Sequence, residues 1–346
     1  VINHYISLSK KGNNYTCCCP FHEEKTPSFV VSPQKAIFHC FGCGAGGNVL
    51  TFIKDYEGLN FVEAVEKLAE LNNVTVPREN IFGNDNFTKI YEINDIVANF
   101  YFDALKNPKQ KSIVQYLKER GISGQTAKNF KIGFADFNQN ELLKILQSKF
   151  SEKDILESGN FLKNEKGFYP FLRNRVTFPI FNSTGKTIGF GGRVTDDSMP
   201  KYLNSKDSKF FNKTRELYGF NNAKKDHKTE DFIVTEGYMD VVMLSEYGIN
   251  NAVASLGTAF SQNHMNLMFK LRRKITFCFD SDEAGLKAAW RALQISLKNV
   301  VDDKTVRFLF LPEGYDPDSF VKENGEQEFY KTVSYTHLRA HETWSY

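Results

Sequence analysis

The chain has 346 residues, of which 41% are hydrophobic and 25% are charged, and its formal net charge is only +3. This composition fits two or three globular domains, and so small a net charge does not by itself indicate a polyanionic partner. No apolar run approaches the roughly 20 residues that cross a bilayer, and the first residues do not show the cationic-then-apolar pattern of a secretory leader, so nothing in the pattern favours secretion. We therefore expect a cytoplasmic protein without a membrane partner. A first residue of Val1 rather than Met suggests a fragment.

The first predicted element is a cluster of metal-binding side chains. Five of the six cysteines lie between Cys17 and Cys43, which favours a metal over a disulfide framework. Cys19 and His22 form a Cys-x-x-His pair, and Cys40 and Cys43 form a Cys-x-x-Cys pair. Two such pairs supply the closed set of thiolate and imidazole ligands that suits one structural Zn²⁺.

Other residues nearby could compete for the same ion. Cys17 or Cys18 could replace Cys19, although Cys18 would then have a less usual spacing to the histidine. His39 adjoins Cys40 in a predicted strand, so their side chains point to opposite faces. We expect His39 not to be a ligand.

The segment after the metal cluster reads as a helix and then a linker. Residues 61–71 place apolar side chains on one helical face, and Asn60 and Glu63 have the spacing of a capping box. Residues 76–85 contain Pro, Gly and Asn, which break the periodicity and predict a linker.

Helices dominate the next stretch, and a hairpin follows it. Between 87 and 159 the periodicity predicts helices over 89–107, 111–120 and 152–158, the last capped by Ser151 and closed by Gly159. Residues 174–181 and 186–194 alternate like strands on either side of the turn Asn-Ser-Thr-Gly, which predicts a hairpin.

From residue 231 onward, strands and helices alternate. Strands are predicted over 231–236, 251–255, 274–280 and 306–312, and helices are predicted over 239–248 and 283–299. This β-α-β rhythm indicates a parallel sheet covered by helices.

Acidic residues cluster at the ends of three predicted strands: Glu236 and Asp240, Asp280 and Asp282, and Asp316 and Asp318. The carboxyl ends of parallel strands meet at one edge of a sheet, where neighbouring strands lie about 4.8 Å apart. Crowded carboxylates repel one another unless cations neutralise them, and hard oxygen ligands favour Mg²⁺ or Mn²⁺. Any one of these residues alone would be read as a helix cap, whereas three successive strand ends predict a catalytic metal site.

A basic stretch precedes the acidic cluster, with eleven Lys/Arg against four Asp/Glu between Lys163 and Arg215. Arg173 and Arg175 alternate with apolar residues, so on a strand both would point to one face. Further cations follow at Arg193, Lys201 and Lys213. A phosphate-binding face and an ordinary solvated face are equally compatible with this spacing.

Longer motifs carry a resemblance. The segment CCPFHEEKTPSFVVSP, followed by FHCFGCGAGGNVLTFI, resembles the zinc-ribbon domain of bacterial DnaG-type primases. The motifs RVTFPI, GFGGRV, PKYLNS, LYGF, EGYMDVV, FDSDEAGLKAA and DPDSF resemble that family's catalytic core in the same order. The match covers nearly everything from residue 1 to about residue 330. The last residues, VSYTHLRAHETWSY, resemble nothing in the family and read as an artefact.

The resemblance implies a multidomain chain of α+β and α/β class. Its expected segments are a zinc ribbon over 1–80, a mixed α+β subdomain with a basic template-binding face over 86–230, a toprim-type parallel α/β subdomain over 231–330, and an unmatched tail over 333–346. It implies primer synthesis on a single-stranded DNA template from ribonucleoside triphosphates. A replicative helicase would bind through a C-terminal domain that is missing here, and the chain is expected to be a monomer.

The resemblance also assigns roles to individual residues. The four ligands Cys19, His22, Cys40 and Cys43 match the zinc site. Glu236, Asp280 and Asp282 match the family's metal-binding carboxylates, and Asp240, Asp316 and Asp318 match further acidic positions. The residues implied to hold template and nucleotide are Arg173, Arg175, Arg193, Lys201 and Lys213.

Two other classes of protein compete with this interpretation. A topoisomerase or nuclease could use the same acidic residues, but no segment resembles a domain carrying a nucleophilic tyrosine. A zinc-stabilised DNA-binding or repair scaffold without catalysis would not need the acidic set.

Overall fold

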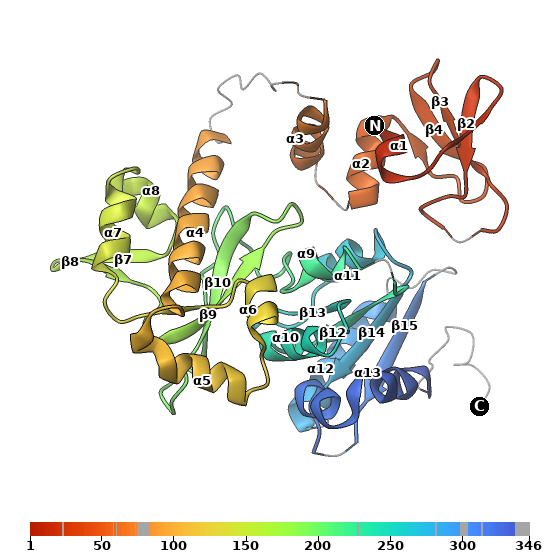
Figure 1. Cartoon of the computed structure of the whole chain (residues 1–346). Helices are drawn as coiled ribbons and strands as arrows, with labels where there is room; N and C mark the ends of the chain where they lie inside the picture. The colour runs from red at the N-terminus through yellow and green to blue at the C-terminus, as the bar shows by residue number, and fades with distance from the viewer. Residues whose placement is uncertain are drawn as a thin grey trace. The chain divides into compact units, whose positions relative to one another are not determined.

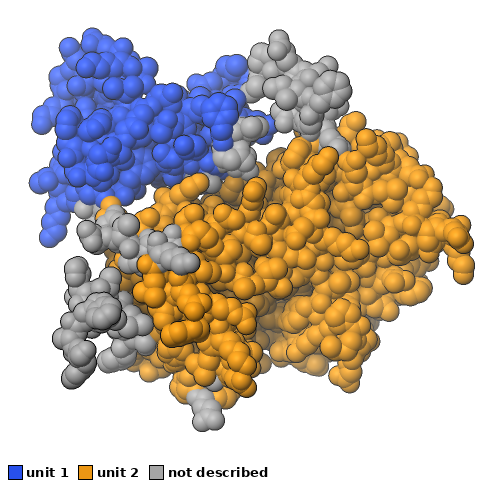
Figure 2. Space-filling view, turned by 180° about the vertical axis from the view of Figure 1, so that it is seen from behind, with its two compact units in different colours: residues 1–79 blue, residues 80–346 orange. Residues whose placement is uncertain are grey.

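The computed structural model describes residues 1–22, 24–57, 59, 61–72, 74, 84–226, 228–280, 282–297, 304–312 and 314–335. The chain divides into two compact units, Val1–Glu79 and Asn80–Tyr346 (Figure 2). The capping box predicted at Asn60, most of the linker and the tail beyond residue 335 lie outside the described residues. The last two residues of the predicted linker are instead helical, because a helix begins at Asn84.

The first unit contains a five-stranded antiparallel sheet in the order β1-β2-β3-β4-β5 (Figure 1). Its strands are β1 (Ser9–Lys11), β2 (Asn14–Cys17), β3 (Phe29–Ser32), β4 (Ile37–Cys40) and β5 (Gly46–Gly47), and its helices are α1 (Ile2–Tyr5), α2 (Val49–Glu57) and α3 (Phe61–Leu71). Phe29 and Phe38 stack at 5.2 Å on the inner face of the sheet, and Phe52 from α2 packs edge-on against both. So small a core gains stability from a bound metal.

The second unit begins with helices around a four-stranded sheet of order β11-β10-β9-β6, next to a separate β7-β8 hairpin. The helices are α4 (Asn84–Ala104), the short 3₁₀ helix η1 (Pro108–Gln110), α5 (Lys111–Glu119), α6 (Gly124–Asn129), α7 (Asn140–Gln147) and α8 (Glu152–Glu157). The strands are β6 (Gly133–Ala135), β7 (Phe161–Asn164), β8 (Gly167–Pro170), β9 (Arg175–Phe181), β10 (Thr187–Arg193) and β11 (Tyr202–Asn204). Ser151 caps α8 as predicted, and β9 and β10 form the predicted antiparallel hairpin.

The rest of the second unit is a parallel sheet of order β13-β12-β14-β15, as the alternating pattern predicted. Its elements are α9 (Phe220–Ala223), β12 (Asp231–Thr235), α10 (Tyr238–Glu246), β13 (Ala252–Ala254), α11 (Gln262–Phe269), β14 (Lys274–Phe279), α12 (Glu283–Leu297), β15 (Thr305–Phe310) and α13 (Pro317–Tyr335). Apolar residues of α10 and α13 pack on one face, and those of α9, α11 and α12 pack on the other. Both faces are therefore covered, as a parallel sheet requires.

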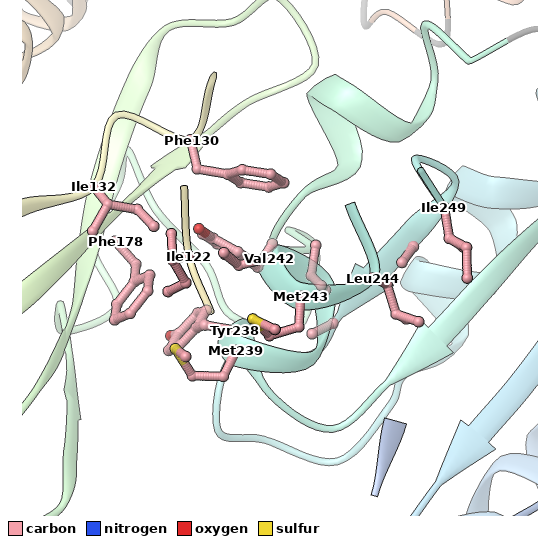
Figure 3. Packing of buried hydrophobic residues seen from close by; sticks show 14 of the residues in the cluster. Ile122, Phe130, Ile132, Phe178, Tyr238, Met239, Val242, Met243, Leu244 and Ile249 are labelled. Carbon is pink, nitrogen blue, oxygen red and sulfur yellow. The ribbon is translucent and has the colours of Figure 1, made fainter. Parts of the chain in front are cut away.

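One hydrophobic core joins the two halves of the second unit. Phe178 of β9 stacks on Tyr238 of α10 at 5.6 Å, and Phe130 stacks on Tyr218 at 5.9 Å. Figure 3 shows Phe130, Ile132 and Phe178 gathered around α10. Because interiors are close-packed, this core fixes the β9–β10 hairpin relative to the parallel sheet. None of the helices within the described ranges combines the length and hydropathy needed to span a membrane.

Candidate functional site: a zinc knuckle pair and an acidic sheet edge

The four predicted zinc ligands come together in the first unit. The Sγ atoms of Cys19 and Cys43 are 3.8 Å apart, and Cys40 Sγ lies 3.6 Å from His22 Nδ1. All four ligand atoms lie within 4.8 Å of one another. Tetrahedral zinc with bonds of about 2.3 Å to sulfur and about 2.1 Å to nitrogen requires about 3.8 Å between two sulfurs and about 3.6 Å between sulfur and nitrogen. The ligand set and its spacing therefore fit Zn²⁺.

Backbone amides surround the thiolate of Cys40 in the Cys-x-x-Cys pair. The N–H groups of Gly42 and Cys43 point at Cys40 Sγ, with nitrogen–sulfur distances of 3.3 and 3.4 Å. These contacts stabilise a thiolate rather than a thiol. A Cβ atom on Gly42 would lie 2.5 Å from His22 Nε2, so glycine leaves room for the imidazole.

Glu24 is a supporting residue that the sequence analysis missed. Its Oε2 atom lies 3.3 Å from His22 Nε2, the ring nitrogen that faces away from the thiolates. Its Oε1 atom accepts from the amides of Cys19 and Ser28 at 2.7 and 2.9 Å. A carboxylate on the remote nitrogen of a ligating histidine fixes its tautomer and orientation. The Cys-x-x-His-x-Glu spacing could have signalled this role.

The competing ligands lie outside the group. Cys17, Cys18 and His39 do not belong to the set of side chains that meet within 4.8 Å in the described part of the chain. The His39 ring instead packs edge-on against Phe41 at 4.9 Å.

The second site is the carboxyl edge of the parallel sheet. Glu236 directly follows β12 and Asp280 directly follows β14, and these two strands are parallel neighbours. The amide of Asp280 donates to Glu236 Oε1 at 3.3 Å. Asp282 stands just before α12, where its Oδ1 atom accepts from the amide of Gly285 at 2.7 Å. The fold thus brings these strand-end carboxylates to one edge.

Three further acids approach this edge from α10 and α13. Asp240 is buried, and its Oδ2 atom accepts from the amide of Gly237 at 2.9 Å. Asp316 caps α13 by accepting from the amide of Ser319 at 2.7 Å. Asp318 is buried on the first turn of α13. Asp240 and Asp316 therefore each accept a hydrogen bond from a nearby backbone amide, and Asp318 is held in place by burial.

The carboxylates repel one another electrostatically. Burial, followed by the charges of Glu236, Asp316 and Asp282, raises the pKa of Asp280 to about 6. Burial, then Asp280, raises the pKa of Asp240 well above its ordinary value. Burial, then Asp282, also raises the pKa of Glu236. Such an arrangement costs free energy unless positive charge compensates it.

The geometry suits a hard divalent cation. Asp280 Oδ1 is buried and has no hydrogen-bond partner among the described residues. Within those residues, the four zinc-type ligands are the one group that meets within 4.8 Å, so the acidic side chains are less tightly gathered. Mg²⁺ binds through one or two carboxylates and keeps waters and phosphates as its other ligands. Glu236, Asp280 and Asp282 fit that role.

The predicted basic residues divide into two environments. Arg173 and Lys201 are exposed and Lys213 is half-buried, whereas Arg175 and Arg193 are buried. The basic stretch is therefore not one continuous solvated face.

One expectation about this stretch is wrong. Arg173 and Arg175 do not share the face of a strand, because β9 begins only at Arg175 and Asn174 has a positive φ of 49°. The guanidinium of Arg175 is instead buried, and its Nη1 donates to the carbonyls of Gly192 and Lys201, both at 3.3 Å. Burial lowers its pKa. Arg175 ties neighbouring strands together.

The guanidinium of Arg193 lies over two aromatic rings, and its charge acts on Asp318 at the acidic edge. Its guanidinium carbon lies 5.8 Å from the ring centroid of Tyr116 and 5.5 Å from that of Tyr202. Arg120, which the sequence analysis did not single out, lies beside Asp318, with its Nη1 atom 3.7 Å from Asp318 Oδ2. Only the packing of α5 against the sheet reveals Arg120, because no local motif marks it. Two arginines thus stand beside the carboxylates.

Three of the sequence motifs meet at one buried tyrosine. The hydroxyl of Tyr238 donates to Asn204 Oδ1, and Asn204 Nδ2 donates to the carbonyl of Leu256 at 2.9 Å. A Cβ atom on Gly191 would lie 2.7 Å from the Tyr238 ring. The motifs EGYMD, PKYLNS and GFGGRV therefore form one packed unit beside the acidic edge.

A pocket of about 690 Å³ opens next to the carboxylates. Glu236 and Asp282 line it together with Thr258 and the cations Lys287 and Arg291 of α12. It offers space for a polar ligand directly beside the candidate metal site.

Comparison with known proteins supports the same organisation. Family models match a CHC2 zinc finger over residues 1–84, the N-terminal domain of the DNA primase catalytic core over 100–224, and a Toprim-like domain over 233–321. The DNA primase of Pseudomonas aeruginosa is 48% identical over 340 residues, which are 95% of this chain and 51% of that protein. The DNA primase of Escherichia coli is 42% identical over 337 residues, 95% of this chain and 58% of that protein.

Solved structures agree. The zinc-binding and RNA polymerase domains of the Aquifex aeolicus primase superpose with a TM-score of 0.68 at 38% identity, covering 97% of this chain and 82% of that one. A DnaG primase catalytic domain bound to single-stranded DNA gives a TM-score of 0.68 at 39% identity, covering 73% of this chain and 83% of that one.

Fold and site together define a zinc-ribbon protein with a toprim-type catalytic fold. The chain belongs to the DnaG-type DNA primase family. It spans about half the length of the curated relatives it matches.

Proposed function

We propose that this chain is a DNA primase that synthesises short RNA primers on single-stranded DNA from ribonucleoside triphosphates. The observation that carries the proposal is the state of Asp280. Its backbone amide donates to Glu236, its Oδ1 atom has no partner among the described residues, and burial, followed by the charges of neighbouring carboxylates, raises its pKa to about 6. This is the environment expected of a carboxylate that binds a divalent cation.

The residues of the second unit would divide the work. Exposed Arg173 and Lys201 would hold template phosphates with little reading of sequence. Arg193 and Arg120 would bring positive charge toward a triphosphate at the acidic edge. Glu236, Asp280 and Asp282 would hold Mg²⁺ or Mn²⁺.

Bound there, such ions would lower the pKa of an attacking 3′-hydroxyl and would stabilise the leaving pyrophosphate. The bond from O3′ to the α-phosphorus would form as the bond from that phosphorus to pyrophosphate breaks, and the hydroxyl proton would pass to water. The protein contributes positioning and charge rather than a covalent nucleophile. By resemblance, the zinc ribbon would contact template bases and help to select start sites.

The test is primer synthesis by the whole chain, loaded with zinc. With single-stranded DNA, labelled ribonucleotides and Mg²⁺, we expect short RNA products, and none when Mg²⁺ is omitted. Asp280→Asn should abolish them. Glu165→Gln, at an exposed position in the loop between β7 and β8, should not. Relaxation of supercoiled DNA without RNA synthesis would point to a topoisomerase instead, and DNA binding without products would point to a scaffold.

A further inference from the structure

His264, a fully buried residue at the start of α11, is hydrogen-bonded to the backbone of Lys213. His264 Nδ1 accepts from the amide of Ser261 at 3.2 Å, and its Nε2 lies 3.0 Å from the carbonyl oxygen of Lys213. A backbone N–H can only donate, so Nδ1 carries no proton. The proton must then be on Nε2, which donates it to the carbonyl. The two contacts fix both the tautomer and the orientation of the ring.

Other hydrogen bonds hold the same short segment. Ser261 Oγ donates to the carbonyl of Thr214 at 2.6 Å, and Thr258 Oγ1 donates to the carbonyl of Lys213 at 3.4 Å. On the other side, the amide of Lys213 donates to Asp207 Oδ1 at 2.9 Å. The backbone of Lys213 is thus held at both its N–H and its C=O group.

The ammonium of Lys213, by contrast, has no hydrogen bond or ion pair with any described residue. Its backbone is anchored to Thr258, which lines the pocket shared by Glu236 and Asp282. A lysine whose backbone is fixed next to a residue of this pocket, and whose ammonium bonds to none of the described residues, is available to an anionic ligand.

We propose that His264 is a positioning residue, which holds the Lys213 segment so that the lysine ammonium meets a phosphate group at the acidic edge. The inference rests on the proposed function, because the phosphate would belong to the DNA template or to the nucleotide. His264 itself touches neither ligand. Fixing the lysine backbone in advance lowers the ordering cost of binding.

The protonation state of His264 makes the proposal testable without changing charge. Burial is the main cause that lowers the pKa of His264, to about 4, so the ring is neutral near pH 7.5. His264→Asn keeps an acceptor near the Ser261 amide but cannot reach the carbonyl of Lys213. If this variant loses a phosphate contact, the cause is therefore a displaced Lys213 segment and not a change of charge at residue 264.

The first arm measures affinity for a fluorescent oligo-dT strand by anisotropy between 50 and 200 mM salt, without Mg²⁺. Each phosphate contact on a single strand contributes about 0.7 to the slope of log affinity against log salt. If the lysine holds template, Lys213→Gln lowers the slope by about 0.7. His264→Asn should lower it equally, and the double variant should go no further.

The second arm measures binding of a fluorescent ATP analogue in the presence of Mg²⁺. If the lysine holds nucleotide, both single variants lose about tenfold in affinity, the value of one charge-assisted hydrogen bond. Met265→Ala is the matched control, because this buried neighbour on α11 contributes packing only. It should lower the melting temperature and leave both binding measurements unchanged. Ser261→Ala removes the hydrogen bond to the carbonyl of Thr214 but not the one from His264 to Lys213, so it should reduce binding less than His264→Asn does.

The outcomes separate cleanly. If Lys213→Gln weakens either arm and His264→Asn leaves both at wild-type values, the positioning role is wrong. It is also wrong if Lys213→Gln changes neither arm. If the wild-type chain binds neither oligo-dT nor the Mg²⁺–nucleotide, the proposed function itself fails.

Discussion

Replacing Asp280 by asparagine should stabilise the protein while it abolishes primer synthesis. Asparagine has the same shape as aspartate and leaves the backbone amide that donates to Glu236 unchanged. It removes one negative charge from the crowded carboxyl edge of the sheet. The pKa of Asp280 is raised from its ordinary 3.8 to about 6, first by burial and then by Glu236, Asp316 and Asp282. A carboxyl whose folded pKa is raised lowers stability wherever it is ionised.

The magnitude follows from that change in pKa. A rise from 3.8 to about 6 corresponds to at most about 3 kcal/mol at neutral pH. Asp280 is only half-buried, and water screens its charge, so we expect a gain of about 1 kcal/mol. The unfavourable effect of the charge grows between pH 4 and pH 6 and is constant above that. The advantage of asparagine should therefore be full at pH 7.5 and nearly absent at pH 4.

The assay is thermal unfolding of the whole zinc-loaded chain in buffer free of Mg²⁺. A gain of about 1 kcal/mol raises the melting temperature of a unit of this size by about 2 °C. Glu165→Gln, which removes an exposed charge in the loop between β7 and β8, should leave the melting temperature unchanged. A melting temperature equal to or below that of the wild type at pH 7.5 would refute mutual repulsion at the sheet edge. Added Mg²⁺ should stabilise the wild type more than the variant.

Three further predictions follow from individual contacts. Glu24→Ala should weaken zinc binding by about 10–100-fold in competition with a chromophoric chelator, since the carboxylate orients a ligating histidine; unchanged affinity would exclude that role. Gly191→Ala should cost about 1–3 kcal/mol in denaturant unfolding, because its Cβ would lie 2.7 Å from the Tyr238 ring, whereas Gly124→Ala, with open space around it, should cost far less. His264 has a folded pKa of about 4, below its ordinary 6.5, so the unfolded chain binds more protons between these values. The wild type should therefore lose about 2 kcal/mol relative to His264→Asn between pH 7 and pH 5, and parallel curves would contradict the assignment.

The sequence predicted those features whose signal is local. The zinc knuckles are read from spacing alone, and the β9–β10 hairpin and the parallel sheet are read from alternation and turn residues. The convergence of Glu236 and Asp280 followed from a general property of parallel sheets, whose carboxyl ends meet at one edge. The structure brings these two residues together as that property requires.

Features that depend on tertiary packing could not be predicted. The burial of Arg175 was missed because alternation says which residues share a face only within a strand, and β9 begins at that residue. Arg120 reaches Asp318 across nearly two hundred residues of sequence, so no local pattern marks it. The grip of His264 on Lys213 likewise joins distant segments. Such residues become visible only when the common core has placed the two halves of the second unit.

The most direct test of the account is binding of Mn²⁺ to the acidic edge, measured by the loss of the free-ion signal in electron paramagnetic resonance. The wild-type chain should bind Mn²⁺ at pH 7.5, and both Asp280→Asn and Glu236→Gln should weaken that binding at least tenfold while zinc content stays constant. Equal Mn²⁺ affinity in the wild type and both variants would contradict the claim that these carboxylates hold the catalytic cation.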